Sequence, residues 1–347
     1  MDDAARDVLQ RGVDERVFPC AVAEWGTATQ VQERLVIGRL TYAAGAPPAT
    51  EATIFDLASL TKVLATTLCA MQAVDRGVLA VTDPIRTYLP EWTGADRAEV
   101  SIEDLLSHAS GLPAWFPLYR DCRGIAAAVS RIASLPLSYA PRSAAIYSDL
   151  GFILLGRLLE IARSRPLDAQ FSDVAHALGC ADTIGFRCPV ATAESCAPTE
   201  LDLAWRGRLL RGEVHDENAW ALGGVAGHAG LFGTTEAVGV FARHFLQVLQ
   251  GRSGLVSGHT TAHFFTRRPV PGSSRALGWD TMLPTSSCGG RMSPRAVGHT
   301  GFTGTSLWID PDRGRYAVLL TNRVHPSRAG DGIQASRSAF HDAVWTR

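Results

Sequence analysis

The sequence has almost no lysine. Lys62 is the only one in 347 residues, so the other 32 of the 33 basic residues are arginines. A Walker phosphate loop needs glycine before its lysine and serine or threonine after it, whereas Lys62 lies between Thr61 and Val63. A pyridoxal enzyme or a protein kinase would have to use this same lysine, and the glycine and acidic motifs of those enzymes do not surround it. Because arginine stays charged while lysine can lose its proton and act as a base, Lys62 is a candidate for chemistry.

Other absences narrow the class of protein. Residues 1–7 are acidic where a secretory signal would be basic, and no apolar run of that type follows, so we expect a cytoplasmic protein. The uncharged stretch 63–74 is too short to cross a bilayer. The 33 basic and 34 acidic residues nearly cancel, which gives no electrostatic reason to expect nucleic acid or a membrane as partner. No G-x-S-x-G motif occurs, which argues against an α/β-hydrolase.

Cysteines are few and scattered. The seven cysteines are odd in number and form no C-x-x-C pair, so reduced thiols are expected. A metal site formed by Cys180, Cys188 and Cys196 is the minor alternative. We expect neither a metal nor a cofactor.

The two ends of the chain carry similar patterns. Hydrophobic residues make up 46% of the chain and no repeat or low-complexity linker divides it, so one interwoven globular body is expected. The patterned segments at the ends are a helix over 2–16, strands over 21–25, 35–41, 307–309 and 316–320, and a final helix from about Gly332. These segments predict one antiparallel sheet built from both ends.

The region between the ends is mostly helical by composition. A helix over 59–76 is expected to stop at Gly77, a typical left-handed cap. Ser101 and Asp104 have the spacing of a capping box, and further helices are expected from about Leu150 and over 234–249. The middle of the chain is therefore predicted to form a helical lobe.

Ser59 and Lys62 place a hydroxyl and an amine three residues apart. On a helix this spacing brings both onto one face within hydrogen-bonding reach, as a nucleophile and its base require. If Ser59 opens its helix, the free main-chain N–H groups there also favour an anion. The alternative is that Ser59 only caps the helix and Lys62 is solvated.

Two later segments carry groups that could assist. Tyr147 precedes Ser148 and Asp149 at the start of an amphipathic helix, where its hydroxyl could be a second proton carrier if a cation lowered its pKa. The segment 299–305 begins with His299 and contains glycines that permit close approach of a ligand. Taken singly, each has a plainer interpretation, as a half-buried aromatic beside a helix cap and as a glycine-rich bend.

Taken together, the order and separations of these three segments resemble the serine β-lactamase and penicillin-binding-protein superfamily, in its class C-like branch. The resemblance covers nearly the whole chain. Further stretches that carry it are 55–58, 77–90, 105–113, 227–235 and 277–279.

The resemblance implies an α+β fold of the β-lactamase/transpeptidase type. An antiparallel five-stranded sheet flanked by helices would pack on an all-helical lobe. Residues 1–80 and 195–347 would form the sheet domain and residues 81–194 the helical domain, with the active site in the cleft between them.

It also implies roles for individual residues. Ser59 would be acylated, while Lys62 and Tyr147 would share its proton. Main-chain N–H groups of Ser59 and Phe302 would form the oxyanion hole. The residues expected to face or line the substrate are His299, Thr300, Gly301, Phe302 and Asp149, with Trp115, Phe116 and Tyr119 on the pocket wall.

Two positions depart from the family pattern. Asp149 stands where asparagine is usual, and His299 stands where the β-lactamases have lysine. An ionised Asp149 would hold Lys62 protonated, raise the pKa of Tyr147 and repel a substrate carboxylate. We hypothesise that Asp149 turns selectivity away from anionic substrates; the plainer alternative is that aspartate caps the helix as asparagine would.

The motifs favour a serine hydrolase that acts on a carboxylic ester or a D-configured peptide or amide, with carboxylesterase first. A β-lactamase or a D-alanyl-D-alanine carboxypeptidase is the alternative, acyl transfer would use the same chemistry, and a non-catalytic scaffold is the alternative of another class. A metal bound by His215, His228 and the acidic residues 213–217 is less favoured than a loop at the cleft mouth. The partner is expected to be a small-molecule ester, amide or peptide, and the oligomeric state stays open.

Overall fold

The computed structural model describes residues 3–188 and 193–346, and its main feature is an antiparallel sheet of order β2-β1-β11-β10-β9-β8. The strands are β1 (Cys20–Thr27), β2 (Val31–Gly38), β8 (Asp280–Thr281), β9 (Val297–Thr300), β10 (Ser306–Asp310) and β11 (Arg315–Thr321). Because β1 pairs with β11, the two ends of the chain build one sheet, as predicted. The expected five strands become six, since β8 has only two residues and is too short to show an alternating pattern.

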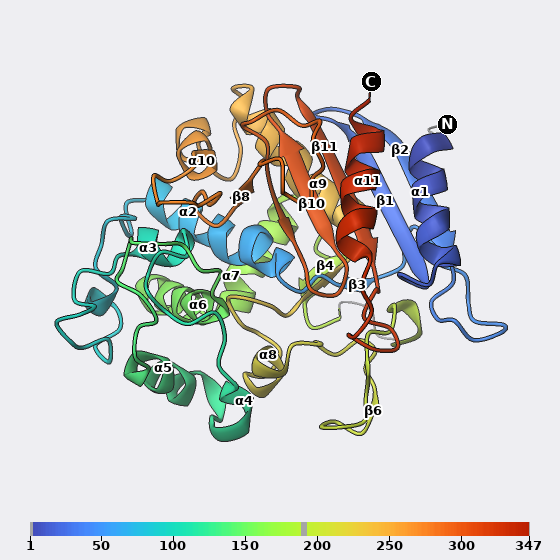
Figure 1. Cartoon of the computed structure of the whole chain (residues 1–347). Helices are drawn as coiled ribbons and strands as arrows, with labels where there is room; N and C mark the ends of the chain where they lie inside the picture. The colour runs from blue at the N-terminus through green and yellow to red at the C-terminus, as the bar shows by residue number, and fades with distance from the viewer. Residues whose placement is uncertain (1–2, 189–192, 347) are drawn as a thin grey trace.

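Helices cover both faces of this sheet. Successive side chains of a strand point to opposite faces. On β11, Ala317 and Leu319 pack with α1 (Asp3–Asp14) and α11 (Ile333–Val344). Val318 and Leu320 face the other way, into the larger core that includes α9 (Thr235–Leu249). Figure 1 shows α1 and α11 side by side against the sheet, with the chain ends near each other.

The remaining helices gather mostly beside the second face of the sheet (Figure 1). They are α2 (Leu68–Asp75), α3 (Ile102–Leu106), α4 (Leu118–Asp121), α5 (Gly124–Ser134), α6 (Asp149–Arg163), α7 (Leu167–Ala177), α8 (Glu217–Ala221) and α10 (Gly258–Phe265). Ser101 and Asp104 make the predicted capping box at α3. Gly77 follows α2 with φ of +63°, a conformation that costs little only for glycine.

Short strands interrupt the helical region. β4 (Ile184–Phe186) lies within residues 81–194, where only helices were expected, and joins β3 (Phe55–Asp56) and β7 (Leu231–Gly233) in the order β3-β7-β4. A separate pair, β5 (Leu201–Asp202) and β6 (Arg208–Leu209), forms a hairpin that projects from the body of the molecule (Figure 1). Strands of two or three residues leave no periodic signal, because their pairing is decided by distant partners.

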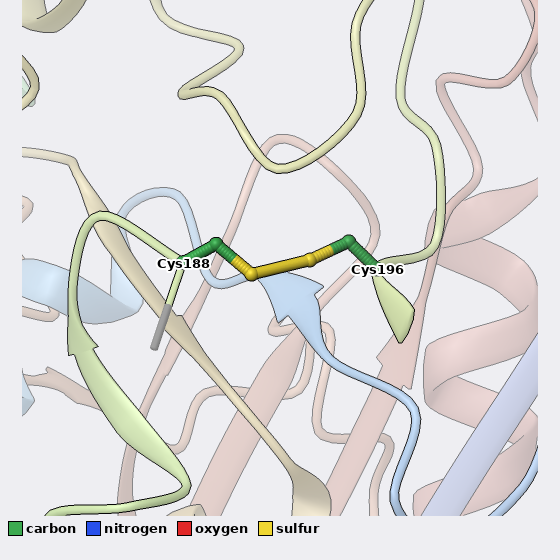
Figure 2. Close-up of a disulfide and its surroundings, with 2 residues drawn as sticks. All are labelled: Cys188 and Cys196. Atoms are coloured by element: carbon green, nitrogen blue, oxygen red, sulfur yellow. A yellow bond between two sulfur atoms is a disulfide. The ribbon is translucent and has the colours of Figure 1, made fainter. Parts of the chain in front are cut away.

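A disulfide corrects the expectation that all thiols are reduced. Figure 2 shows the sulfur atoms of Cys188 and Cys196 joined beside the end of β3. The main chain of Cys196 pairs with that of Ile54, just before β3. This pairing places the side chain of Cys196 near Cys188, which follows β4. The sequence spacing alone does not show this meeting. The other five cysteines are free and buried, and Cys180 does not join the pair.

No helix among residues 3–188 and 193–346 has the length and apolar character needed to span a membrane.

Candidate active site

A tight turn after β3 presents Ser59. Ala58, directly before it, has φ of +47°, an uncommon conformation for a residue with a side chain. Buried Asp56 holds the turn, since Oδ1 accepts the N–H of Ala58 at 2.8 Å and Oδ2 accepts the N–H of His215 at 2.7 Å. Burial raises the pKa of this carboxyl in spite of both bonds. Asp56 therefore links the serine turn to the segment that begins at His215.

The predicted helix over 59–76 is present, but it is not regular along its whole length. Its turn Lys62–Thr67 is π-helical, and the α-helix α2 follows from Leu68 to Asp75. Such turns widen a helix locally and occur frequently at functional sites. The predicted approach of Ser59 and Lys62 is nevertheless present, with 3.0 Å between Nζ and Oγ.

Lys62 is fully buried and its ammonium group has three acceptors. Nζ donates to Oγ of Ser59, to Oδ1 of Asp149 at 2.7 Å and to the carbonyl oxygen of His228 at 3.1 Å. An ammonium group has three N–H donors, so these bonds satisfy it. Tyr147 approaches the same serine, and its hydroxyl donates to Oγ of Ser59 at 2.8 Å.

The charges around this group favour protonated Lys62 and protonated Tyr147. Burial would lower the pKa of Lys62, but the adjacent Asp149 and Tyr147 outweigh burial and raise it. For Tyr147, burial raises the pKa, and Asp149 adds to the rise against the opposing effect of Lys62. In the resting site Lys62 and Tyr147 therefore both hold their protons, and the pair must lose one proton before it can act as a base for Ser59.

His108, which sequence reasoning did not single out, fixes the position of Tyr147. The two rings lie 4.7 Å apart, and Nδ1 of His108 accepts the N–H of Ser148 at 3.0 Å. Burial, with nearby Arg275 and Lys62, lowers the pKa of His108 well below its usual value, which suits a ring nitrogen that accepts a hydrogen bond. His108 lies in the stretch 105–113 that carries the family resemblance, so a signal was present in the sequence.

The segment from His299 to Phe302 lies against the serine turn. Thr303 Oγ1 donates to the carbonyl of Asp56 at 2.7 Å, and Thr305 Oγ1 donates to that of Leu57 at 3.0 Å. Buried Arg337 holds the segment from behind through its Nη2, which donates to the carbonyls of Gly301 and Thr305. These bonds bring the turn after β9 next to Ser59.

His299 supplies no fixed positive charge. Its ring is buried, its Nδ1 lies 2.8 Å from the carbonyl oxygen of Thr300, and its centre is 5.8 Å from that of Tyr147. Burial, together with the charges of Arg275 and Lys62, lowers its pKa well below the usual value. The ring is thus neutral at neutral pH.

A cavity of about 260 Å³ opens at Ser59. Its wall consists of Ala58, Ser59, Trp115, Tyr147, Asp149, His215, Asp216, Glu217, Ala229, Phe302 and Arg328. Five of the predicted site residues are in this wall, and Lys62 lies buried behind Ser59. His299, Thr300, Gly301 and Tyr119 are outside the wall, and Phe116 packs against the core instead of lining the cavity.

Four polar wall residues, His215, Asp216, Glu217 and Arg328, were given no role in the site from the sequence, although the stretch 213–217 was expected as a loop at the cleft mouth. The first three belong to the cluster considered for a metal. The structure instead pairs the His215 ring with Glu200 at 3.0 Å and the His228 ring with Asp216 at 2.8 Å. Within the described part of the chain, no group of three or more histidine, cysteine or acidic side chains is arranged to hold a metal.

Comparison with known proteins agrees with this arrangement. A family model described as Beta-lactamase matches residues 6–339. A protein of Salmonella gallinarum (strain 287/91 / NCTC 13346), named as a D-alanyl-D-alanine carboxypeptidase, is 34% identical over 316 residues, which cover 80% of this chain and 71% of the relative. Among solved structures, EstCE1, described as a hydrolase with promiscuous acyltransferase activity, aligns with a TM-score of 0.78 at 22% identity over 99% of this chain and 98% of its own. Simvastatin synthase (LovD) from Aspergillus terreus aligns with a TM-score of 0.76 at 20% identity over 98% and 97%.

The fold, the cavity and these likenesses define a serine hydrolase. Because the family model spans nearly the whole chain, the protein belongs to the β-lactamase family.

Proposed function

We propose that this protein hydrolyses carboxylic esters through an acyl-enzyme on Ser59. The observation that carries the proposal is the convergence on one oxygen: Oγ of Ser59 accepts from Lys62 at 3.0 Å and from Tyr147 at 2.8 Å. A hydroxyl held between two proton carriers beside an open cavity is the arrangement that nucleophilic catalysis needs.

The proposed reaction starts when the Lys62–Tyr147 pair has lost one proton. Oγ of Ser59 then attacks the ester carbonyl and gives its proton to the pair. The negative oxygen that forms accepts hydrogen bonds from the main-chain N–H groups of Ser59 and Phe302. As the C–O bond breaks, Tyr147 returns the proton to the departing alkoxide, which leaves as an alcohol. Water, deprotonated by the same pair, hydrolyses the acyl-serine and restores Ser59.

The charges of the cavity favour a neutral substrate. Asp149, Asp216 and Glu217 bring carboxyl groups to its wall. Burial opposes ionisation of Asp216, but the His228 ring and the N–H of Ala219 outweigh it and lower the pKa. Arg328, the cation of the wall, is already bound by Glu200 and Glu217 at 2.6 and 2.7 Å. A substrate carboxylate would meet repulsion there.

A D-configured peptide or amide is the second candidate. The 34% identity to a protein named as a D-alanyl-D-alanine carboxypeptidase favours it. The chemistry at Ser59 would be the same, with an amine as leaving group, and a β-lactam would be opened at the same carbonyl. In our proposal, peptides and β-lactams that carry a carboxylate are poorer substrates than neutral esters, because His299 is neutral and the cavity wall is acidic.

The proposal also includes the two domains of the chain and its location in the cell. We place the site between a sheet domain of residues 1–80 and 195–347 and a helical domain of residues 81–194. A cytoplasmic location remains the sequence-based expectation, although disulfides such as Cys188–Cys196 persist mainly in oxidising compartments.

The test is hydrolysis of p-nitrophenyl butyrate by wild type, by Ser59→Ala and by Ser134→Ala, which removes an exposed hydroxyl on α5. We expect loss of activity in Ser59→Ala alone, and labelling of wild type by a fluorophosphonate that Ser59→Ala does not show. Release of D-alanine from a D-alanyl-D-alanine peptide with no ester hydrolysis would favour the second candidate. An active Ser59→Ala would refute the nucleophile, and an unlabelled wild type would favour a scaffold.

A further inference from the structure

Exposed apolar side chains concentrate around the cavity mouth. Eleven large hydrophobic side chains of the described residues are exposed. Seven of them are in the cavity wall or in the neighbouring segments 201–209 and α8: Trp115, Leu201, Leu203, Trp205, Leu209, Trp220 and Phe302. Leu203, in the hairpin, is 69% exposed. Apolar patches on this scale commonly mark a binding surface.

Four aromatic rings form a continuous strip, here named the aromatic shelf: Trp115, Tyr119, Trp205 and Trp220. Trp115 belongs to the cavity wall, and its ring centre lies 6.5 Å from that of Tyr119. Tyr119 meets Trp205 edge to face at 4.7 Å, and Trp205 meets Trp220 at 5.1 Å. The shelf thus starts inside the cavity and leads outward to α8 and the β5–β6 hairpin.

Buried polar groups hold the shelf in place. Asn218 of α8 accepts the N–H of Tyr119 at 3.0 Å and donates to the carbonyl of Phe116 at 2.9 Å, which joins α8 to α4. Arg206, next to Trp205, pairs with Asp202 and donates to the carbonyls of Val214 and His215, both at 2.7 Å. The hairpin is therefore tied to the cavity wall, and the rings are positioned before any ligand arrives.

The size of the cavity indicates what the shelf accommodates. A space of about 260 Å³ is below the roughly 300–1,000 Å³ typical of sites that enclose a whole small molecule. A short acyl or alkoxy group fits, whereas a longer one must leave the cavity, and Trp115 offers an apolar path onto the shelf. Aromatic faces and edges bind alkyl and aryl groups without requiring charge.

We propose that the aromatic shelf binds the extended alkyl or aryl group of an ester whose carbonyl lies at Ser59. This inference rests on the proposed ester hydrolysis and adds its substrate class: long-chain or aryl esters in preference to short ones. The group that the shelf binds is apolar in either case, whether it belongs to the acyl part or to the alcohol part of the ester.

The test compares two ester series on wild type, Trp205→Ala and Trp220→Ala. One series is p-nitrophenyl acetate and octanoate, which lengthens the acyl part; the other is methyl acetate and octyl acetate, which lengthens the alcohol. For each series we compare kcat/KM of the long ester with that of the short ester. Where the long group binds to the shelf, we expect this ratio to fall about tenfold in both variants. Val31→Ala is the control, because Val31 is exposed on β2, the edge strand of the main sheet, and belongs neither to the cavity wall nor to the shelf.

An unchanged ratio in both series would overturn the proposal. If that result came with a shift of Trp205→Ala from dimer to monomer in sedimentation, the shelf would be an interface between two copies of the chain. If wild type hydrolyses no ester, the proposed function fails separately, and the shelf is tested by binding. Methyl octanoate should then quench tryptophan fluorescence of Ser59→Ala more strongly than methyl acetate does, and the double variant with Trp205→Ala should lose this difference. A preserved difference would overturn the shelf.

Discussion

The Nζ atom of Lys62 lies 2.7 Å from Oδ1 of Asp149, in a contact between residues 87 positions apart in the chain. The lysine is fully buried, and the carboxylate is mostly so. A buried cation must be paired to remain charged. Asp149 therefore stabilises the protonated form of the group that would deprotonate Ser59.

We expect Asp149→Asn to shift the ascending limb of the pH profile of kcat/KM to lower pH. Asp149 raises the pKa of both Lys62 and Tyr147, so its removal lowers both, and the pair loses its proton more readily. The profile is measured with p-nitrophenyl butyrate. Asp7→Asn, which removes an exposed carboxylate on α1, should leave the limb in place. If the ascending limb of Asp149→Asn stays at the same pH or moves to higher pH, deprotonation of the Lys62–Tyr147 pair does not limit the rate.

The same variant tests substrate charge. Loss of the Asp149 carboxylate removes one repulsive group from the cavity wall, so Asp149→Asn should act relatively better on a carboxylated ester. We expect the ratio of kcat/KM for monomethyl succinate to that for methyl butyrate to rise severalfold. If the ratio does not change, the Asp149 carboxylate does not select substrates by charge; helix capping is not its role either, because Ser148 caps α6.

Lys62→Arg should reduce kcat by roughly a thousandfold or more, as loss of a general base does. Arginine keeps the positive charge but does not release its proton, and its larger planar group does not match the three acceptors around Nζ. Steady-state kinetics and the rate of fluorophosphonate labelling measure the effect. Arg76→Lys, the reverse exchange at an exposed position after α2, is the control. Near-normal activity of Lys62→Arg would exclude proton transfer by this residue.

Gly301→Ala should impair both stability and catalysis. A Cβ atom there would lie 2.1 Å from Oγ1 of Thr305 and 2.6 Å from the carbonyl oxygen of Leu57, so the turn after β9 must move away from the serine segment. We expect a loss of about 1–3 kcal/mol in the free energy of unfolding, as overpacking usually costs, and a lower kcat. Gly290→Ala, where a Cβ meets open space, is the matched control. Equal behaviour of the two variants in denaturation and kinetics would contradict this close approach.

The disulfide predicts a thiol count. In denaturant, a thiol-reactive dye should titrate the five free cysteines before reduction and all seven after it. Cys188→Ser with Cys196→Ser should give five in both conditions. Seven thiols without reduction would show that the two sulfurs are not bonded in the protein as prepared.

Several features of the fold follow from short stretches of sequence. Short runs rich in apolar and β-branched residues predict β1 and β11, and the local rules for helix ends predict the Ser101 capping box and the stop at Gly77. The proximity of Ser59 and Lys62 is also local, because it depends on a separation of three residues. Short strands such as β8 and β4 are outside the reach of these rules, because two or three residues contain no period.

The sequence by itself thus determined the serine–lysine pair, the elements around it and the family to which they belong. The tertiary structure decided what surrounds the pair: the bond from Lys62 to Asp149, the place of His215 and Asp216 in the cavity wall, and the contact of Trp115 with Tyr119 in the aromatic shelf. The physical reason is that helix and turn preferences act within a few residues. Charge pairing, burial and ring contacts act between segments that only the folded chain brings together.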